Sequence, residues 1–388
     1  MKICHIYESA FFESGGVVRY IYDQGRGIAN RGHTVELCTC NTSEHIVDSQ
    51  RAWGDAVRLH SLSSAGLSRY LFRSKRNPVI TSLFESCSVI HIHGLWSPVS
   101  LSIARYAFLQ NIPYVITLHG MLDDWSMSQR GFKKRLYLRA FANSMLVKAS
   151  AVITSTTKER EQALHWLPDS RVEVLPPVMD LDPFLELPSK DTACKAYFPE
   201  GAPERPVVLF LSRIHEKKGA EILIRAMKIL EGESCQCNLV IAGVGDDRYV
   251  QSLKCLVSEL GLEPLVRFVG MVDGELKASL YAMADVFVLP TAQENFGLVF
   301  TESMACGTPV LTSAGIDICD ELEQSGGAVL SERTPEAFAT ALIHMLKDDS
   351  NLKAMGDKGR EWVFREFSVN HILDAHESLY ETVGKKDH

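Results

Sequence analysis

Short runs of apolar residues alternate along the chain with longer stretches in which apolar residues recur every three or four positions. The short runs predict buried β-strands, and the longer stretches predict amphipathic helices. Regular alternation of strand and helix is typical of α/β domains, in which helices cover both faces of a parallel sheet. The clearest predicted strands are 2–7, 114–118, 207–211, 239–242 and 286–289, and the clearest predicted helices are 17–31, 220–230, 335–347, 351–366 and 369–383.

The alternation begins twice, at Lys2 and again at Pro206, and a proline-rich segment without periodicity, 175–192, lies between the two starts. A chain of 388 residues is also longer than one ordinary hydrophobic core requires. We therefore predict two domains, 1–185 and 186–368, with a linker where the periodicity is lost.

The most informative segment is the junction between the predicted strand 286–289 and a helix that starts near Gly297. Backbone N–H groups at the start of a helix lack intrahelical partners and carry the positive end of the helix dipole, so an anion such as a diphosphate fits there. Glu294 precedes this helix and Glu302 lies in its second turn, where their carboxylates can accept hydrogen bonds from hydroxyl groups. Glutamates at such a junction also serve as helix caps without any ligand.

Basic residues follow a second buried strand, 207–211, in the sequence V-V-L-F-L-S-R-I-H-E-K-K-G. Ligands of open parallel sheets bind outside the carboxyl ends of the strands. Arg213, Lys217 and Lys218 are therefore expected to converge with Glu294 at one edge of the sheet. Two or three cations there would neutralise a diphosphate, which favours a nucleotide-sugar site over helix capping.

The second half of the chain resembles the retaining nucleotide-sugar glycosyltransferases of glycosyltransferase family 4, which have the GT-B fold. The order and spacing of the matching motifs agree with that family. They are Ser212-Arg213 followed by Lys218-Gly219, A-G-V-G at 242–245, V-R-F-V-G at 266–270, and E-N-F-G-L-V-F-T-E-S-M-A-C-G-T-P-V at 294–310.

The resemblance implies a role for each matching residue. Arg213 and Lys218 are expected to bind the donor diphosphate, Glu302 the ribose and Glu294 the transferred sugar. It further implies that the motif around the helix start contacts the donor through Asn295, Phe296, Gly297, Leu298 and Val299. The two basic side chains replace a metal in neutralising charge, so neither a metal nor a separate cofactor is expected.

The resemblance also implies an architecture, namely two Rossmann-like, doubly wound parallel-sheet domains that face each other across a cleft. The first would lie on the acceptor side and be joined by the C-terminal helix, about 369–388. The second would bind the donor. The implied reaction moves a sugar, with retention at the anomeric carbon, to the hydroxyl of a sugar, lipid-linked or small-molecule acceptor. Synthesis of a bacterial-type surface polysaccharide, glycolipid or lipid-linked oligosaccharide is the implied setting.

Two other functions remain open from the sequence. One is a nucleotide-sugar 2-epimerase of the same fold, which needs no acceptor, and the other is a non-catalytic relative that binds a nucleotide sugar. A glycosidase that uses Glu294 and Glu302 is disfavoured, because hydrolysis does not need Arg213 and Lys218 beside a helix terminus. The chain also lacks the G-x-S-x-G and G-x-x-x-x-G-K-[ST] motifs of acyl hydrolases and nucleotide hydrolases.

In the first half, Gly15 and Gly16 open the predicted helix 17–31 directly after a strand and loop. Such a pair lets backbone approach a ligand closely and resembles the glycine-rich loop that faces the donor in the family. His119 follows the strand 114–118 and matches the family histidine that lies against the donor sugar and the acceptor. The resemblance therefore implies that His119 is catalytic, together with Arg213, Lys218 and Glu294.

Three motifs favour structural interpretations. His91 and His93 share one face of a strand, but no third ligand stands at a known spacing, so hydrogen-bonded strand histidines are favoured over a metal site. The D-x-D sequence at 180–182 lies in the linker and predicts a turn. Gly243 and Gly245 follow the strand 239–242 without a complete G-x-G-x-x-G pattern, so tight turns are favoured and a nicotinamide cofactor is not.

Charge is distributed unevenly between the two halves. Residues 1–180 contain 20 Lys and Arg against 15 Asp and Glu, net +5, whereas the remainder contains 20 against 33, net −13. The basic excess lies mainly in 69–76 and 130–148. The second of these has no acidic residue and alternates Phe132, Leu136, Phe141 and Met145 with basic residues. Contact with an anionic membrane and an ordinary helix with a solvated basic face are both open interpretations.

Composition and motifs bear on partners and compartment. The computed pI of 5.9 and the lack of a known binding module argue against nucleic acid as a partner. The ten cysteines form no C-x-x-C pair, which is typical of free thiols in a reducing cytosol. No apolar run approaches the ~18 residues of a membrane span. We therefore expect a cytoplasmic protein that is soluble or peripheral on the inner face of the membrane.

Overall fold

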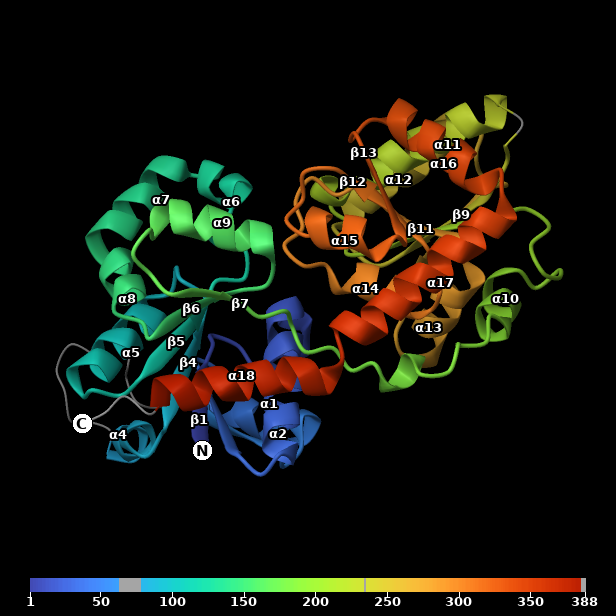
Figure 1. Cartoon of the computed structure of the whole chain (residues 1–388). Coiled ribbons are helices and arrows are strands. Elements are labelled where there is room, and N and C mark those ends of the chain that lie inside the picture. Colours follow the sequence, from blue (N-terminus) through green and yellow to red (C-terminus); the bar gives the residue numbers. More distant parts are fainter. Residues whose placement is uncertain (63–77, 234, 385–388) are drawn as a thin grey trace. The chain divides into compact units, whose positions relative to one another are not determined.

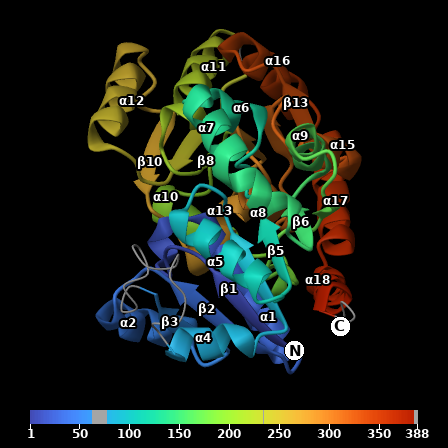
Figure 2. The same cartoon turned by 90° about the vertical axis from the view of Figure 1, so that its left-hand side faces the viewer.

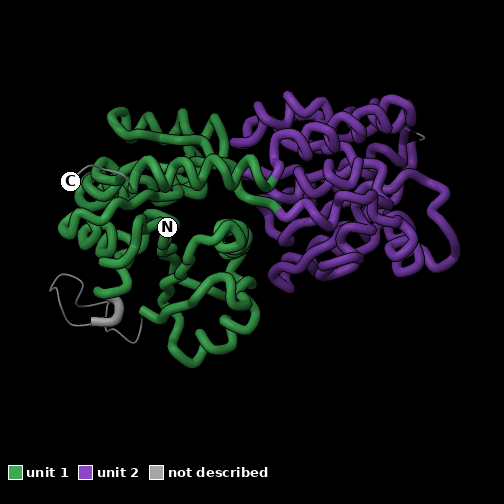
Figure 3. The backbone as a smooth tube through the Cα atoms, turned by 60° about the horizontal axis from the view of Figure 1, so that its bottom comes forward, with its two compact units in different colours: residues 1–179, 369–388 green, residues 180–368 purple. Residues whose placement is uncertain are grey.

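The computed structural model describes residues 1–62, 78–233 and 235–384, except for the side chains of residues 13 and 78–80. The chain divides into two compact units (Figure 3). Unit 1 comprises Met1–Met179 and Val369–His388, and unit 2 comprises Asp180–Ser368. The first boundary thus lies six residues before the predicted 185/186 boundary, because the short helix η4 (Asp182–Phe184) belongs to unit 2.

The described strands of unit 1 form one parallel sheet in the order β3-β2-β1-β4-β5-β6-β7. Their bounds are β1 (Lys2–Ile6), β2 (Thr34–Thr39), β3 (Val57–Ser61), β4 (Val89–His93), β5 (Tyr114–Thr117), β6 (Ala151–Thr154) and β7 (Val172–Val174). The described helices are η1 (Phe12–Ser14), α1 (Gly16–Asn30), α2 (Ser43–Trp53), α4 (Pro78–Glu85), α5 (Pro98–Leu109), α6 (Asp124–Ser128), α7 (Gly131–Tyr137), the π-helical turn η3 (Leu138–Ala142), α8 (Asn143–Val147), α9 (Thr157–Trp166) and α18 (Val369–Gly384).

The two faces of the unit 1 sheet carry different side chains. Ile90 and Ile92 of β4 belong to an apolar core with α5, which lies over the sheet in the view of Figure 2. His91 and His93 alternate with them and therefore point to the opposite face. Helices α1 and α18 lie side by side on that face (Figure 1), and His91 bonds Tyr380 of α18 there. The last helix of the chain thus completes the first unit.

Unit 2 contains a parallel sheet in the order β10-β9-β8-β11-β12-β13, counted over its described residues. Its strands are β8 (Val207–Leu211), β9 (Asn238–Ala242), β10 (Val266–Gly270), β11 (Val286–Leu289), β12 (Val310–Ser313) and β13 (Ala328–Ser331). Its helices are η4, α10 (Asp191–Tyr197), η5 (Glu216–Lys218), α11 (Ala220–Gly232), α12 (Asp247–Glu259), α13 (Gly274–Met283), α14 (Leu298–Ala305), α15 (Cys319–Ser325), α16 (Pro335–Leu346) and α17 (Asp349–Glu366).

Both sheets have the strand order of a doubly wound fold, so the prediction of two Rossmann-like domains is confirmed. The order reverses between β1 and β4 in unit 1 and between β8 and β11 in unit 2. Ligands of such sheets bind at the carboxyl ends of the strands where the order reverses. The segments that follow these four strands are therefore the places to examine for a site.

The structure also decides three smaller predictions. The D-x-D sequence is a turn, in which the Asp180 carboxylate accepts a hydrogen bond of 3.1 Å from the backbone N–H of Asp182. All ten cysteines lie in the described part of the chain and none forms a disulfide; five are buried, four are half-buried and Cys255 is exposed. Within the described residues, no helix is both long enough and apolar enough to cross a bilayer.

Candidate active site

The point where the unit 2 sheet reverses brings Lys218 and Glu294 together. Lys218 ends η5 after β8, Glu294 lies in the loop after β11, and the ammonium group forms a short ion pair with the carboxylate. The Lys218 side chain is about nine-tenths buried and that of Glu294 about four-fifths, so both charges are largely removed from water. Such a pair is well placed to exchange partners with a charged ligand. The predicted convergence of these two residues is confirmed.

Glycines allow these two loops to approach each other. Gly219 has φ +77°, and a Cβ there would lie 2.1 Å from the carbonyl oxygen of Pro290, the residue that ends β11. The loops are further joined by a 2.7 Å hydrogen bond from the Ala292 N–H to the Lys217 carbonyl. Only a residue without a Cβ fits beside Pro290, and this close contact places Lys218 against the β11 loop.

Arg333 also ties the two loops together, and no sequence pattern singled it out. Its Nε donates to the Pro290 carbonyl at 2.9 Å, and its guanidinium donates to the Glu216 carbonyl at 3.2 Å. Both acceptors are backbone atoms of segments distant in sequence, so no local pattern marks this contact. Arg333 therefore holds the loop after β11 and the start of η5 together through their backbone carbonyls.

Helix α14 begins directly after this pair. Gly297 precedes it with φ +68°, and a Cβ at Gly297 would lie 2.7 Å from Cγ of Glu294 and 2.7 Å from the Phe300 ring. A glycine is therefore required for Glu294 to lie over the start of the helix. The first backbone N–H groups, at Leu298 and Val299, belong to half-buried residues. They provide the anion-binding end of a helix dipole beside Lys218.

Glu302, one turn into α14, is held by two partners that the sequence did not reveal. Its carboxylate forms a 2.6 Å salt bridge with Lys277 and accepts a 3.0 Å hydrogen bond from the Tyr281 hydroxyl. Burial and the adjacent charge of Glu302 raise the pKa of Tyr281 well above its usual value, so this hydroxyl remains a donor. Both partners lie on α13, four residues apart, where one helical turn aligns them.

The remaining predicted residues of unit 2 differ in exposure. Arg213 follows β8 and is exposed, and Asn295 is half-buried. Phe296 is buried edge-on against Phe367, with ring centroids 5.3 Å apart, so its side chain serves the core and only its backbone is available to a ligand.

Gly243 and Gly245 have a structural purpose, but it is not the predicted tight turn. A Cβ at Gly243 would lie 1.9 Å from the Ser212 carbonyl oxygen, and one at Gly245 would lie 2.0 Å from the Ile214 carbonyl oxygen. The segment after β9 therefore packs directly on the segment after β8, and Ile214 pairs with Gly245 through an isolated β-bridge. Close backbone approach, which a single sequence does not reveal, is the reason for these glycines.

In unit 1, Gly15 and Gly16 open α1 as predicted. Gly15 caps the helix with φ +110°, a conformation that favours glycine, and a Cβ at either position would meet no atom within 4 Å. The backbone there is therefore open to a ligand. His119 follows β5 and is partly exposed, and its backbone is left-handed with φ +53°, which is uncommon for a residue with a Cβ. Burial lowers the pKa of His119 to about 3, so its ring is neutral at physiological pH.

The two strand histidines have hydrogen-bonding partners, as the sequence favoured. His91 bonds Tyr380 Oη at 2.7 Å and Thr117 Oγ1 at 2.6 Å, while His93 bonds His5 at 2.9 Å and His119 at 3.0 Å. The absence of a third histidine was, however, a wrong expectation. Parallel pairing places His5 of β1 beside His91, and one nitrogen of each of His5, His91 and His93 lies within 4.8 Å of the others. Both nitrogens of His91 and of His93 already have hydrogen-bond partners, whereas Nε2 of His5 is buried without one among the described residues.

Within the basic segment 130–148, α7, η3 and α8 follow one another without a break and with helical backbone at both junctions, so residues 131–147 form one helix that contains a π-turn. Phe132, Leu136 and Phe141 are exposed by 82%, 58% and 54%, and acidic residues are absent from the segment. Met145, by contrast, is buried in the hydrophobic core of unit 1. The other basic segment, 69–76, lies outside the described residues.

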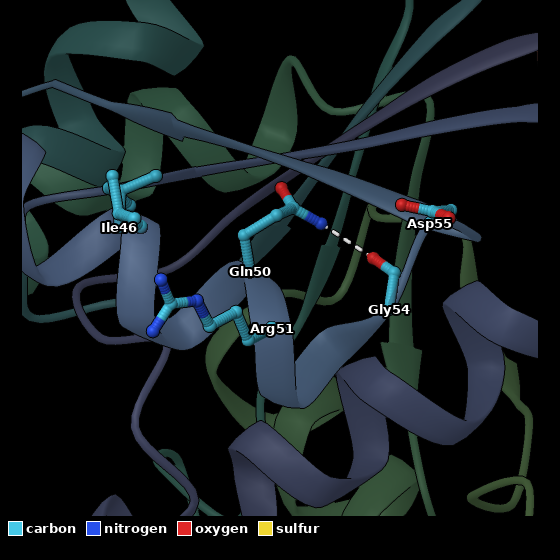
Figure 4. Close-up of a pocket in the computed structure, with 6 residues that line it drawn as sticks. Ile46, Gln50, Arg51, Gly54 and Asp55 are labelled. Carbon is cyan, nitrogen blue, oxygen red and sulfur yellow. Dashed lines mark hydrogen bonds between the residues drawn. The ribbon is translucent and has the colours of Figure 1, made fainter.

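A separate pocket lies along α2 in unit 1 and contains none of the predicted site residues. Its lining includes Gln50, whose side-chain amide donates to the Gly54 carbonyl at 2.6 Å and accepts from the Leu59 N–H at 2.8 Å (Figure 4). These contacts fix the end of α2 to β3. The amide of Gln50 is therefore committed to local structure.

Two family models match the chain. One, described as "Glycosyl transferases group 1", matches residues 197–362, and the other, described as "Glycosyl transferase 4-like domain", matches residues 15–177. Between them the two models cover the larger part of both units.

Curated relatives extend this similarity. The chain is 32% identical over 279 residues to a GDP-mannose-dependent alpha-(1-6)-phosphatidylinositol monomannoside mannosyltransferase of Mycolicibacterium smegmatis, covering 69% of this chain and 70% of that protein. It is 27% identical over 395 aligned positions to a D-inositol 3-phosphate glycosyltransferase of Xylanimonas cellulosilytica, covering 96% and 93%.

Solved structures show the same fold. HepE of Anabaena in complex with UDP has a TM-score of 0.80 and 19% identity, covering 98% of this chain and 100% of that one. Sucrose-phosphate synthase from Thermosynechococcus elongatus has a TM-score of 0.77 and 25% identity, covering 98% of each.

Proposed function

Because this chain belongs to the group 1 family of glycosyltransferases and has the GT-B fold, we propose that it transfers a hexose-type sugar from a nucleoside diphosphate to a hydroxyl acceptor, with retention at the anomeric carbon. The observation that carries the proposal is the ion pair of Lys218 and Glu294, held beside the open start of α14. An anion, a cation and unpaired backbone donors at one sheet edge match a sugar joined to a diphosphate.

The proposed roles follow from charge and position. Lys218 and Arg213 bind the donor diphosphate and stabilise it as it departs, and the α14 N–H groups add their dipole. Glu294 accepts hydrogen bonds from the transferred sugar once the ligand draws Lys218 towards phosphate. Glu302, already oriented by Lys277 and Tyr281, accepts hydrogen bonds from the ribose.

In unit 1, we propose that the open backbone of Gly15 and Gly16 approaches the donor and that His119 contacts the transferred sugar. The support for these roles is the match to the family motifs together with the exposed glycine turn and the partly exposed imidazole. The neutral ring of His119 donates or accepts a hydrogen bond without changing charge near neutral pH.

The proposed chemistry keeps all bonds on one face of the sugar. The bond between the anomeric carbon and the phosphate oxygen breaks, and its electron pair stays on the diphosphate. The acceptor oxygen bonds the anomeric carbon from the same face and gives its proton to the departing phosphate oxygen. Lys218 and Arg213 supply the charge stabilisation for the diphosphate, so neither a metal nor a cofactor takes part in the proposed step.

The relatives support a class of donor and acceptor rather than one compound. One is named for a GDP-mannose donor and a phosphatidylinositol mannoside acceptor, and HepE was crystallised with UDP. We propose a nucleotide-sugar donor and a sugar, lipid-linked or small-molecule acceptor, in the synthesis of a bacterial-type surface polysaccharide, glycolipid or lipid-linked oligosaccharide.

We also propose that the segment 130–148 rests on an anionic membrane, a contact that suits a lipid-linked acceptor. Exposed Phe132, Leu136 and Phe141 supply apolar side chains for the interfacial region, and Lys133, Arg135 and Arg139 are exposed among them. Apolar side chains flanked by cations, with no acid between them, are complementary to anionic lipid headgroups.

The test of the transferase proposal is a panel of UDP-sugars and GDP-sugars in which nucleoside diphosphate release is measured with and without acceptors. Acceptor-dependent release supports transfer, release without acceptor together with a C2-epimerised product indicates the epimerase, and binding without release indicates a non-catalytic relative. Lys218→Ala is expected to abolish transfer while the protein stays folded. Lys228→Ala, on the exposed side of α11, is the matched control and keeps full activity.

A further inference from the structure

A chain of three imidazoles leads from the interior of unit 1 to His119. His5 Nδ1 lies 2.9 Å from His93 Nε2, and His93 Nδ1 lies 3.0 Å from His119 Nε2. Neighbouring rings in this chain are stacked, with centroids 5.2 and 5.3 Å apart. His5 and His93 are buried, and only His119 reaches solvent. The outermost ring is therefore held through its inner nitrogen by residues that no ligand can touch.

The rest of the surroundings fix the same ring. The edge of the Tyr20 ring meets His119, with centroids 5.0 Å apart and planes at 85°. The left-handed backbone of His119 is followed by Gly120, whose N–H donates to the Glu159 carboxyl group at 2.6 Å. A second oxygen of Glu159, which is buried on α9, accepts from the Ser155 N–H at 2.6 Å. A strained backbone kept in place by a buried carboxyl group is typical of a residue whose orientation matters.

Proton counting restricts what His119 can present to a ligand. A neutral imidazole carries one N–H, and each of the two hydrogen bonds in the chain needs one donor. In the outward arrangement each ring donates from Nδ1 towards the surface, so His5 Nε2 carries no proton and the proton of His119 is on Nδ1. In the inward arrangement each ring donates from Nε2 towards the interior. The inward arrangement would leave an N–H at His5 Nε2, a buried atom without a hydrogen-bond partner among the described residues.

The outward arrangement is the more favourable one. Buried N–H groups without an acceptor are rarer in proteins than acceptors without a donor. No described residue bonds Nδ1 of His119, so this atom remains available to a ligand on the exposed side of the ring. Burial, reinforced by the neighbouring histidines, holds the pKa of His93 well below its usual value and lowers that of His5 to about 3. The three-imidazole chain is therefore neutral near neutral pH.

We infer that His93 and His5 are positioning residues for His119, and that they fix it as the Nδ1–H tautomer, a hydrogen-bond donor to an oxygen of the bound substrate. That the substrate oxygen belongs to the transferred sugar rests on the proposed function. The tautomer itself is a property of the free protein. The sequence marked His93 only as a structural histidine and did not mark His5.

The test begins with ¹⁵N NMR of histidine-labelled protein without substrate, because protonated and unprotonated ring nitrogens resonate far apart. The neutral side chain of free histidine favours the Nε2–H tautomer, so the expected Nδ1–H signal of His119 is diagnostic of the three-imidazole chain. A wild-type His119 that carries its proton on Nε2 overturns the inference. This measurement needs no variant and no activity.

Variants then separate positioning from folding. His93→Leu removes both chain contacts and is expected to return His119 to the Nε2–H tautomer. His93→Asn keeps an amide donor near the position of Nδ1 and should preserve the Nδ1–H tautomer. His91→Leu is the matched control, since His91 is equally buried on the same strand but bonds Thr117 and Tyr380 instead. His91→Leu should leave the tautomer of His119 unchanged. If His93→Leu also leaves it unchanged, the inference that His93 fixes this tautomer is wrong.

Kinetics test the consequence for catalysis. His93→Leu is expected to lower kcat by about 10-fold or more with little change in the donor KM, and His93→Asn to recover most of that loss. A tautomer change with unaltered kcat overturns the positioning role. If the wild-type protein transfers no sugar at all, the proposed function fails, and the NMR experiment still shows whether His93 and His5 fix the tautomer of His119.

Discussion

Acid is expected to destabilise unit 1 selectively, because this unit buries histidines that fold in the neutral form. Burial, with a contribution from neighbouring His376, lowers the pKa of His5 to about 3. Burial lowers that of His376 itself to about 4, although an interaction with the Pro176 carbonyl opposes the shift. His91 and His93 are shifted in the same direction by burial and by the other histidines. All four are at most 2% exposed, so solvent does not relieve the cost.

The sign and size of the effect follow from proton linkage. Histidines of the unfolded chain bind protons near pH 6.5, whereas His5 and His376 of the folded protein are protonated only near pH 3 and 4. Stability is therefore complete above about pH 7 and falls as the pH drops through 6.5 towards 4. At pH 5, which is about 1.5 units below the unfolded pKa, His5 and His376 each lower the free energy of unfolding by about 2 kcal/mol, since each pH unit corresponds to about 1.4 kcal/mol. Their sum is a large fraction of the ~5–15 kcal/mol that stabilises a typical domain.

Denaturant unfolding of the full chain between pH 7.5 and 5 measures this loss, with tryptophan fluorescence as the reporter. The unit 2 signal should shift far less, because its histidines, His215 and His344, are exposed. Unit 1 contains Trp53, Trp96, Trp125 and Trp166, whereas unit 2 contains Trp362.

Two variants on α18 sharpen the experiment. His376→Gln should lower the pH slope by about one proton, or about 1.4 kcal/mol per pH unit, while His371→Gln, which changes an exposed histidine of the same helix, should not alter it. A unit 1 stability that stays constant from pH 7 to 5 would refute the argument.

Three further perturbations have expected outcomes. Gly297→Ala places a Cβ against Glu294 and the Phe300 ring at φ +68° and should destabilise unit 2 by about 2 to 4 kcal/mol. Denaturant unfolding followed by Trp362 fluorescence measures this loss, and wild-type stability of the variant would show that a glycine is not required at this position. Tyr281→Phe removes a donor to Glu302 and should weaken nucleoside diphosphate binding about tenfold in calorimetry, and unchanged affinity would argue against the ribose contact. Phe132→Ser should reduce sedimentation with phosphatidylglycerol vesicles about tenfold, with neutral phosphatidylcholine vesicles as the control, and equal binding to both lipids would remove the membrane proposal.

Local pattern was sufficient wherever the physics is local. The β-branched run at β11 and the apolar run at β8 predicted their strands correctly, since buried parallel strands need continuous apolar residues. The glycine before α14 and the glutamates around it predicted a helix start with nearby carboxylates, and the structure places Lys218 at that point, as the basic residues after β8 predicted. The functional roles of these residues stay predictions.

Local pattern was insufficient wherever two distant segments meet. The pattern predicts a turn at Gly243, although a glycine is needed there because the Ser212 carbonyl oxygen lies where a Cβ would be. The spacing of the segment 130–148 does not separate buried Met145 from exposed Phe132 and Phe141, because packing against the core of unit 1 decides which side chains are covered. Lys277 and Tyr281 carried no motif, yet they orient Glu302.

The sequence by itself determined that this chain forms two α/β units with parallel sheets, because the period of hydrophobic residues and the residues that start and stop helices are properties of neighbouring positions. Only the tertiary structure decided which polar side chains share an environment. His5 and His93 are 88 residues apart and hydrogen-bond because β1 pairs with β4 in parallel register. Register is fixed by packing across the whole sheet, so a contact of that kind is absent from any local pattern.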